Sequence, residues 1–348
     1  MGKRIGILLT VFIIVSTVPG ATPQQTVQDS MDGDRCVING DKRFISGMNI
    51  AWVSSTSFGN DVGDNKIDIN SFTTYVKQIR RAGGNSLRWW LHTDASNCPK
   101  IDSTGAVTGL GSETISNITE VLDTAYAYGV VVSLCLFSFD MLVPGDGDGK
   151  ASYSDYDLQS NHRFLTEANN IDTYLENGLG PILDSVGSHP AIMCWEVFNE
   201  PEGMLASAGW SHVEEKISQD DILRITNKIA GYVHRNSKKM VSTGIASTDY
   251  VDEYSDDQLA AAGDDNDGYL DFYMVHYYPE WQGESMSPFH NPASSWNMDR
   301  PVLIGEFPAK SWDTSMIGES SGQSLKTSKD IVEAYDYAYQ NGYAGAMS

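Results

Sequence analysis

The stretch Ala191–Gly203 reads AIMCWEVFNEPEG and joins a run of apolar residues directly to a carboxylate. Its apolar first part predicts a short strand that is buried on both faces, as in a parallel sheet. Pro201 cannot donate a hydrogen bond to a sheet and restricts the preceding residue to extended backbone, so we expect the strand to end there. Glu200 is thereby placed at the carboxyl end of a buried strand, where α/β barrels and open parallel sheets carry their functional groups.

A second strand of the same design, PVLIGEF, carries Glu306 near its end. The predicted strands are Phe44–Trp52, Asn85–Leu91, Gly129–Phe137, Ala191–Phe198, Lys239–Gly244, Leu270–Tyr277, Pro301–Phe307 and the start of an eighth in the final AGAMS. The predicted helices are Asp68–Ala82, Ser112–Tyr128, Asn170–Val186 with a break near Gly178, Ser218–Asn236 and Ser328–Gln340. This alternation predicts an α/β protein, a (β/α)₈ TIM barrel. A doubly wound open sheet is the alternative, but no G-x-G-x-x-G follows an early strand.

The N-terminus has the features of a secretory signal peptide. Lys3 and Arg4 precede the apolar run Ile5–Val15, which is followed by small residues near Gly20 and Ala21. The run is shorter than the roughly 20 residues that a membrane-spanning helix needs. We expect a signal peptide over residues 1–20, a short N-terminal segment over 21–35, one barrel domain over 36–348, and secretion to the extracellular space.

The chain has 348 residues with 46 acidic and 23 basic side chains, a formal net charge of −23. Such a surface repels nucleic acid and polyanionic polymers, so a neutral substrate is the expected partner. We expect no nucleic-acid partner and no membrane partner, and a monomeric protein.

The four cysteines form no C-x-x-C pair and give no support for zinc or thioredoxin-like chemistry. Cys135 and Cys194 lie within predicted core strands and are expected to be buried thiols. An oxidising compartment permits a disulfide between Cys36 and Cys98 without requiring one. Asn117 begins the one plausible glycosylation sequon.

The alternation of side chains along a strand predicts which polar residues near the strand ends share a face. Arg88, Trp90 and His92 are predicted to share one face of the second strand, and His276 and Tyr278 one face of the sixth. A buried arginine or histidine is costly unless it is paired. Carboxylates at the mouth of a barrel would supply the partners.

Glu200 and Glu306 form a pair that fits glycoside hydrolysis, which needs one protonated and one ionised carboxyl group. A retaining reaction needs the two groups about 5–5.5 Å apart, which strands four and seven allow across a barrel mouth. Arg88 and Tyr278 are expected to stabilise the charge of Glu306, and apolar surroundings to keep Glu200 protonated. Glu196 lies deeper and is predicted to join an ion-pair network inside the barrel.

The motif WEVFNEPEG at Trp195–Gly203 resembles the strand-four Asn-Glu-Pro motif of glycoside hydrolase family 5, retaining barrels that act on β-linked polysaccharides. The motif GEF at Gly305–Phe307 resembles the strand-seven nucleophile motif of that family. The resemblance implies that Glu200 is the acid/base, that Glu306 is the nucleophile and that Asn199 binds the 2-hydroxyl of the sugar under attack.

Two further motifs match the family. Arg88 in LRWWLH corresponds to its strand-two arginine, and His276 and Tyr278 to its strand-six H-x-Y pair. Within the family, NEPEG followed by Met204, SFDM at 138–141 and HYYPEW at 276–281 most resemble the endo-β-1,4-mannanases of invertebrate animals. The implied activity is retaining hydrolysis of internal bonds in mannan, galactomannan or glucomannan. An endo-β-1,4-glucanase and a non-catalytic polysaccharide-binding barrel are the alternatives.

No metal or organic cofactor is expected, because carboxylates perform both the proton transfer and the nucleophilic attack. Aromatic faces pack against pyranose rings, which makes four tryptophans candidates for sugar stacking, with core packing as the alternative. These are Trp90, Trp210, Trp281 and Trp312, of which Trp281 is favoured. The residues expected to bind or support the substrate are Arg88, Trp90, His92, Asn199, His276, Tyr278 and Trp281.

The sequence departs from the family at two places. Family members normally continue the eighth strand into a tryptophan and a closing helix, whereas this sequence stops at Ser348. If it is a fragment, the barrel is expected to be truncated within its eighth βα unit. Phe139 and Asp140 stand where many relatives have histidine. The loop from Asp146 to Gly149 has carboxylates that suit calcium but lacks the glutamate of an EF-hand, so an acidic loop over the cleft is expected.

Overall fold

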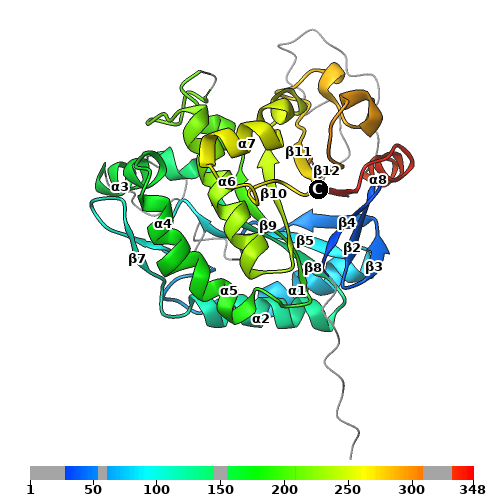
Figure 1. Cartoon of the computed structure of the whole chain (residues 1–348). Helices are drawn as coiled ribbons and strands as arrows, with labels where there is room; N and C mark the ends of the chain where they lie inside the picture. Colours follow the sequence, from blue (N-terminus) through cyan, green and yellow to red (C-terminus); the bar gives the residue numbers. More distant parts are fainter. Residues whose placement is uncertain (1–27, 54–60, 145–154, 208, 309–330) are drawn as a thin grey trace, which may run out of the picture.

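A computed structural model describes residues 28–53, 61–144, 155–207, 209–308 and 331–348. Its centre is a closed barrel of parallel strands, which confirms the predicted (β/α)₈ fold (Figure 1). The barrel strands are β4 (Ile45–Asn49), β5 (Ser86–Thr93), β8 (Val131–Ser138), β9 (Ile192–Asn199), β10 (Met240–Ile245), β11 (Tyr273–His276), β12 (Val302–Glu306) and β13 (Gly345–Met347). Neighbours in the barrel are neighbours along the chain, and β13 closes the ring by pairing with β4.

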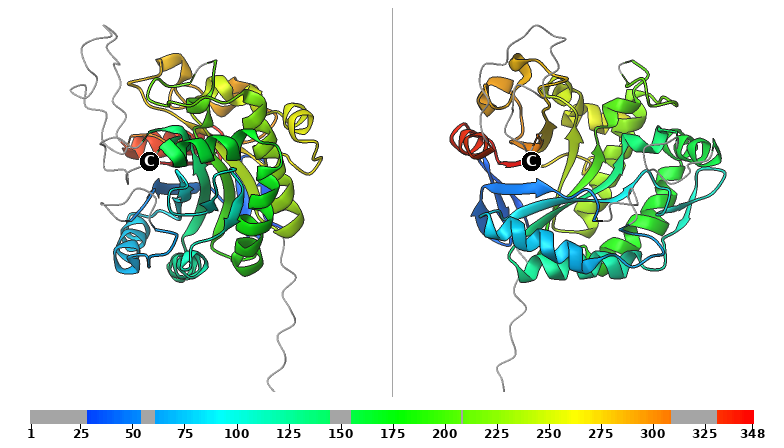
Figure 2. Two further views of the ribbon diagram at one scale, coloured as in Figure 1. Left: turned by 90° about the vertical axis from the view of Figure 1, so that its left-hand side faces the viewer. Right: turned by 180° about the vertical axis from the view of Figure 1, so that it is seen from behind.

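Helices surround the strands, as the two views in Figure 2 show. They are α1 (Ile69–Arg81), α2 (Thr114–Ala127), α3 (Asp155–Thr166), α4 (Asn170–Tyr174), α5 (Gly180–Val186), α6 (Gln219–Asn236), α7 (Asp256–Gly263) and α8 (Ile331–Gln340). Two of the predicted starts are confirmed by their caps. The carboxylate of Asp68 accepts from the Ser71 N–H at the start of α1, and Ser218 forms a capping box with Asp221 at the start of α6. Caps of this kind stabilise a helix by about 1 kcal/mol.

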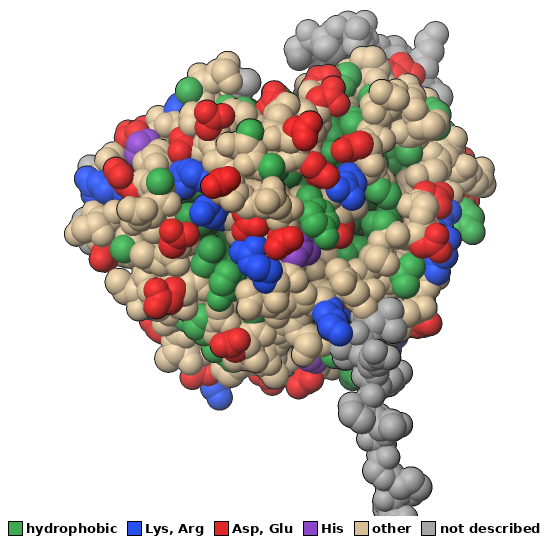
Figure 3. Space-filling model, in the orientation of Figure 1, with side chains coloured by type: hydrophobic (Ala, Val, Ile, Leu, Met, Phe, Trp, Pro, Cys, Tyr) green, Lys and Arg blue, Asp and Glu red, His purple; other side chains and the backbone are tan. Residues whose placement is uncertain are grey.

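The outer surface is polar and carries many acidic side chains, which are scattered over the face shown in Figure 3. Lysine and arginine lie between them, so that part of the negative charge is locally neutralised. Within the described ranges, no helix is long and apolar enough to cross a membrane.

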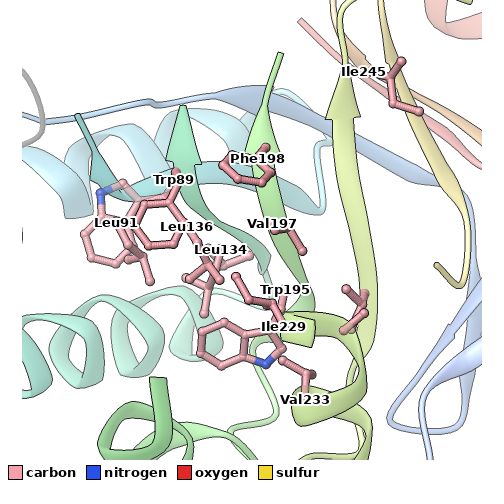
Figure 4. Close-up of a cluster of buried hydrophobic side chains, with 14 of the residues drawn as sticks. Trp89, Leu91, Leu134, Leu136, Trp195, Val197, Phe198, Ile229, Val233 and Ile245 are labelled. Carbon is pink, nitrogen blue, oxygen red and sulfur yellow. The ribbon is translucent and has the colours of Figure 1, made fainter. Parts of the chain in front are cut away.

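An apolar layer lies between the strands and the helices (Figure 4). Leu134 of β8, Trp195 and Val197 of β9, and Ile229 and Val233 of α6 are all fully buried in it. Successive strand residues point to opposite faces, so the residues between these apolar ones point into the barrel. The interior is therefore left for the polar groups described below.

A small antiparallel sheet closes the N-terminal end of the barrel. It consists of β1 (Ser30–Asp32), β2 (Arg35–Ile38) and β3 (Asp41–Arg43). Cys36 and Ile38 of β2 pack in one buried cluster with Met193 and Met240, near the starts of the barrel strands. The sequence pattern did not reveal this sheet, and the predicted boundary between residues 35 and 36 runs through β2.

Other differences from the sequence-based expectations are local. The predicted break near Gly178 is a π-helical turn, η2 (Leu175–Leu179), between α4 and α5. A side chain at Gly178 would meet the ring of Tyr174 at 2.5 Å, and Pro181 lies in the first turn of α5, where no N–H donor is needed. Helices α3 and α7 and the short pair β6 (Lys100–Ile101) and β7 (Val107–Gly109) were not predicted.

All four cysteines are buried and free, which confirms the prediction for Cys135 and Cys194 and shows no Cys36–Cys98 disulfide. The signal peptide, the loop from Asp146 to Gly149, Trp312 and the Ser328 cap lie outside the described residues.

Candidate active site

Irregular pairing at the carboxyl ends of the strands determines which side chains enter the barrel. Between β9 and β10, Glu196 pairs with Ser242 but Asn199 pairs with Gly244, so β9 has one extra residue. An extra residue of this kind changes the direction of the side chains that follow it. Glu196 and Asn199 are three residues apart, yet both reach the same arginine.

That arginine is Arg88 of β5, whose side chain is fully buried. Its Nε and Nη2 donate to the two carboxylate oxygens of Glu196 at 2.8 and 2.5 Å, and Nη2 also donates to Asn199 Oδ1 at 2.8 Å. Its Nη1 donates to Asn49 Oδ1 and Glu306 Oε2, both at 3.0 Å. The predicted ion-pair network of Glu196 is thus confirmed, and Arg88 joins this network to the carboxylate at the mouth.

Glu306 ends β12 and receives three polar contacts. The hydroxyl of Tyr278 donates to its Oε1 at 2.5 Å, while Arg88 Nη1 and His276 Nδ1 lie 3.0 and 3.5 Å from its Oε2. Burial raises the pKa of this carboxyl, but the charges of His276 and Arg88 and the hydrogen bonds from Tyr278 and Arg88 lower it more. The net pKa lies below the usual value, so Glu306 is held ionised.

The backbone of Glu200 is left-handed, with φ 47° and ψ 54°, so the predicted extended geometry before Pro201 is wrong. Two hydrogen bonds impose this conformation. The N–H of Glu200 donates to the carbonyl of Gly244 at 2.7 Å, and its own carbonyl accepts from the N–H of Gly203 at 3.1 Å. A non-glycine residue in this region costs about 1–3 kcal/mol, which the surrounding structure must supply. The predicted end of the strand is confirmed, because β9 stops at Asn199.

The carboxyl group of Glu200 faces the same imidazole as Glu306. His276 Nδ1 lies 2.8 Å from Glu200 Oε1, and the two glutamate side chains are 14% and 21% exposed. Burial raises the pKa of Glu200 and the contact with His276 lowers it, with a net increase above the usual value. The two carboxyl groups at one histidine therefore have pKa values shifted in opposite directions, which separates a proton donor from an anion.

The amide of Asn199 is held in one orientation. Its Oδ1 accepts from Arg88, and its Nδ2 donates to Ser138 Oγ at 3.3 Å. The Ser138 hydroxyl in turn donates to Asp140 Oδ2 at 2.7 Å. Ser138 and Asp140 were not among the predicted site residues, although both stand in the SFDM motif at the end of the third barrel strand.

His92 does not reach the carboxylates. The pairing of β5 with β8 shifts between Trp90 and Thr93, which breaks the alternation on which its predicted position rested. Its ring packs against Phe137 and Tyr174, and its Nε2 lies 3.0 Å from the Tyr174 hydroxyl. Burial lowers the pKa of His92 to about 3, so it is a neutral group between the barrel and the helices.

The candidate tryptophans differ in exposure. Trp281 follows β11 and is 82% exposed, whereas Trp90 is buried with the Arg88 guanidinium 5.3 Å from its ring centroid. Trp210 packs edge-on against Phe139 at 4.5 Å. Trp281 is thus the most exposed of these three, Trp210 is partly buried and Trp90 is buried.

Sequence reasoning also missed Gly244, which lies beneath the polar network. A Cβ at this position would meet Glu196 Oε1 at 2.5 Å, Arg88 Nη2 at 2.9 Å and His276 Nε2 at 3.1 Å. No sequence signal marks it, because the crowding atoms come from three other strands.

Replacing Gly244 with alanine is expected to lower kcat by roughly 10²-fold, because displacing reacting groups by about 1 Å has that effect. Overpacking is also expected to destabilise the fold by about 1–3 kcal/mol. Steady-state kinetics and urea unfolding measure the two effects. Gly283→Ala is the matched control, since no atom lies closer than 3.7 Å to its Cβ. Unchanged kcat in the Gly244 variant would show that the network tolerates displacement.

Comparison with known proteins finds two relatives that share one enzyme name. No protein-family profile matches the chain. It is 29% identical to the mannan endo-1,4-beta-mannosidase of Cryptopygus antarcticus over 91% of this chain and 82% of that protein. It is 28% identical to the enzyme of the same name from Mytilus edulis over 92% of this chain and 86% of that protein.

Solved structures agree. The beta-1,4-mannanase of Aplysia kurodai superposes with a TM-score of 0.76 at 28% identity, over 92% of each chain. The endo-1,4-beta-mannanase of Eisenia fetida has a TM-score of 0.74 at 29% identity, over 92% of this chain and 88% of its own. A glycoside hydrolase family 5 mannosidase from Rhizomucor miehei, at 16% identity and a TM-score of 0.55, shares the fold. The resemblance of this chain to family 5 and its invertebrate mannanases is therefore confirmed, and the protein is a glycoside hydrolase.

Proposed function

We propose that this protein is a secreted, retaining endo-β-1,4-mannanase that hydrolyses internal bonds of mannan, galactomannan and glucomannan by double displacement. The observation that carries the proposal is the meeting of Glu200 and Glu306 at His276 with oppositely shifted pKa values. We further propose a signal peptide over residues 1–20, a short segment over 21–35 and a catalytic barrel over 36–348 that acts as a monomer.

In the first step, ionised Glu306 attacks the anomeric carbon while protonated Glu200 gives its proton to the departing glycosidic oxygen. The product is a glycosyl ester of Glu306. In the second step, Glu200, now a carboxylate, takes a proton from water as the water oxygen attacks the anomeric carbon and releases Glu306. Each carboxyl group returns to its starting protonation state.

The spacing of the carboxyl groups supports retention of configuration. Glu200 Oε1 and Glu306 Oε2 lie 2.8 and 3.5 Å from one nitrogen atom, so their separation is at most the sum of these distances. That limit applies to these two oxygen atoms, and so close an approach favours the spacing of retaining enzymes over the roughly 6.5–9.5 Å between the carboxyl groups of inverting enzymes.

Other residues are proposed to hold the substrate. The amide of Asn199, with its orientation fixed by Arg88 and Ser138, is suited to donate to the 2-hydroxyl of the sugar under attack. The exposed ring of Trp281 is suited to stack on a pyranose face. The acidic surface favours a neutral polymer over a polyanionic one.

The test is release of reducing ends from galactomannan and from carboxymethyl cellulose, together with mobility in a mannan affinity gel. The proposal expects products from galactomannan and a preference for it over cellulose. Products from carboxymethyl cellulose alone would identify a β-1,4-glucanase. Retardation in the gel without any product would identify a sugar-binding barrel.

Replacing Tyr278 with phenylalanine is expected to raise the pKa of Glu306, because the hydroxyl that stabilises its charge is lost. The acid limb of the kcat/KM profile reports this pKa in the free enzyme and should move to higher pH by roughly one unit. Tyr126→Phe, on the exposed face of α2, is the control. An unmoved acid limb would mean that the tyrosine does not set the ionisation of the nucleophile.

A further inference from the structure

Glu202 is a buried glutamate two residues after Glu200. The proposed mechanism does not use it. It lies in the turn η3 (Pro201–Met204) and is 1% exposed. Its Oε2 accepts from the N–H of Ala246 at 3.1 Å, and its Oε1 accepts from the hydroxyl of Tyr254 at 2.7 Å. Both partners belong to the segment after β10, since Tyr254 ends the helical turn η4 (Thr248–Tyr254).

No cation balances this carboxyl among the described residues. Lys216 is near the turn, but its ammonium donates to the carbonyls of Gly203 and Trp210. Burial raises the pKa of Glu202 to about 7, with the hydrogen bond from Tyr254 lowering it and the charge of Glu200 adding to it. A buried, unbalanced acid is a cost to stability, which points to a role in the site rather than in the core.

The position of Glu202 shows what that role is. Glu200 has a left-handed backbone that its neighbours must hold in place, and its N–H already donates to Gly244 near the end of β10. The carboxyl of Glu202 adds a second attachment to the same segment two residues further on, at Ala246. The carbonyl of Ala246 accepts from Gln282, beside Trp281, at 2.6 Å. One residue, Ala246, therefore links the turn of Glu200 to the loop of Trp281 through its N–H and its carbonyl.

We propose that Glu202 is a positioning residue that fastens the turn carrying Glu200 to the segment after β10, and thereby aims the proton donor at the leaving oxygen. This inference rests on the proposed acid/base role of Glu200. Glu202 itself touches neither substrate nor reacting atoms. Its loss should impair protonation of the leaving group and leave attack by Glu306 intact.

The test compares leaving groups. Departure of a mannosyl oxygen from a mannan chain needs a proton, whereas dinitrophenolate departs without one. In Glu202→Leu, which cannot accept either hydrogen bond, kcat/KM on galactomannan is expected to fall by roughly 10²-fold. On dinitrophenyl β-mannobioside, kcat/KM should stay within about 3-fold of the wild type, because this constant reports only the first displacement.

Tyr254→Phe is the second variant, since it removes one hydrogen bond and keeps the carboxyl. It should show the same difference between substrates with a smaller loss, and Glu120→Gln, on the exposed face of α2, should show none. Equal losses on both substrates, or no loss on galactomannan, in Tyr254→Phe and Glu202→Leu would overturn the proposal. A wild-type protein inactive on both substrates would instead refute the proposed function.

Discussion

Replacing Glu306 with alanine is expected to lower kcat on galactomannan by at least about 10⁴-fold, the scale of loss when a covalent nucleophile is removed. The reason is that neither of the two neighbouring glutamates in the described site, Glu200 and Glu196, can take its place. Glu200 has the proposed acid/base role and a raised pKa, and Glu196 is fully buried against Arg88. The release of reducing ends by purified wild type and variant measures the loss, with Glu120→Gln as the matched control.

A small anion should distinguish loss of the nucleophile from loss of the fold. With dinitrophenyl β-mannobioside and azide, the alanine variant is expected to form α-mannobiosyl azide and to release dinitrophenolate, because azide can enter the space left by the carboxylate. Glu200 is not needed for departure of this leaving group. Near-wild-type activity of the variant without azide would rule out Glu306 as the nucleophile.

The sequence predicted much of the architecture because its signals were local. Strands such as β9 and β12 are short, largely apolar runs, and the helices α1 and α6 begin after the capping residues Asp68 and Ser218. Glu200 and Glu306 were found because each follows such a run directly. The pairing of Arg88 with Glu196 followed from the cost of burying an unpaired charge.

The remainder depended on contacts that a linear pattern does not contain. Strict alternation assigned His92 to the site, but an irregularity in β5 turned it toward the helices. The proline rule failed at Glu200, because hydrogen bonds to Gly244 and Gly203 impose a left-handed backbone. The extra residue of β9 likewise appears only when the strand is paired with its neighbour β10.

Arg88 pairs both with Glu196 inside the barrel and with Glu306 at its mouth, so replacing it should affect both stability and activity. Replacing it with alanine leaves Glu196 fully buried without its cationic partner, and the Ser133 hydroxyl, 3.1 Å away, is neutral and cannot balance the charge. Removing one partner of a buried ion pair destabilises a protein by about 3–5 kcal/mol. We expect a loss of this size in urea unfolding. A lysine should recover only part of it, because one ammonium cannot reproduce the forked hydrogen bonds to Glu196.

A double variant separates the two roles of Arg88. Replacing a buried ion pair by apolar residues of similar volume is often neutral or stabilising, so Arg88→Met combined with Glu196→Leu should recover most of the lost stability. Activity should not return, because Glu306 still lacks the Arg88 hydrogen bond at 3.0 Å and the Asn199 amide is no longer held by the arginine. A stable double variant with wild-type kcat would show that Arg88 serves only the fold. A double variant as unstable as Arg88→Ala would show that the loss of stability comes from a cavity and not from the unpaired charge.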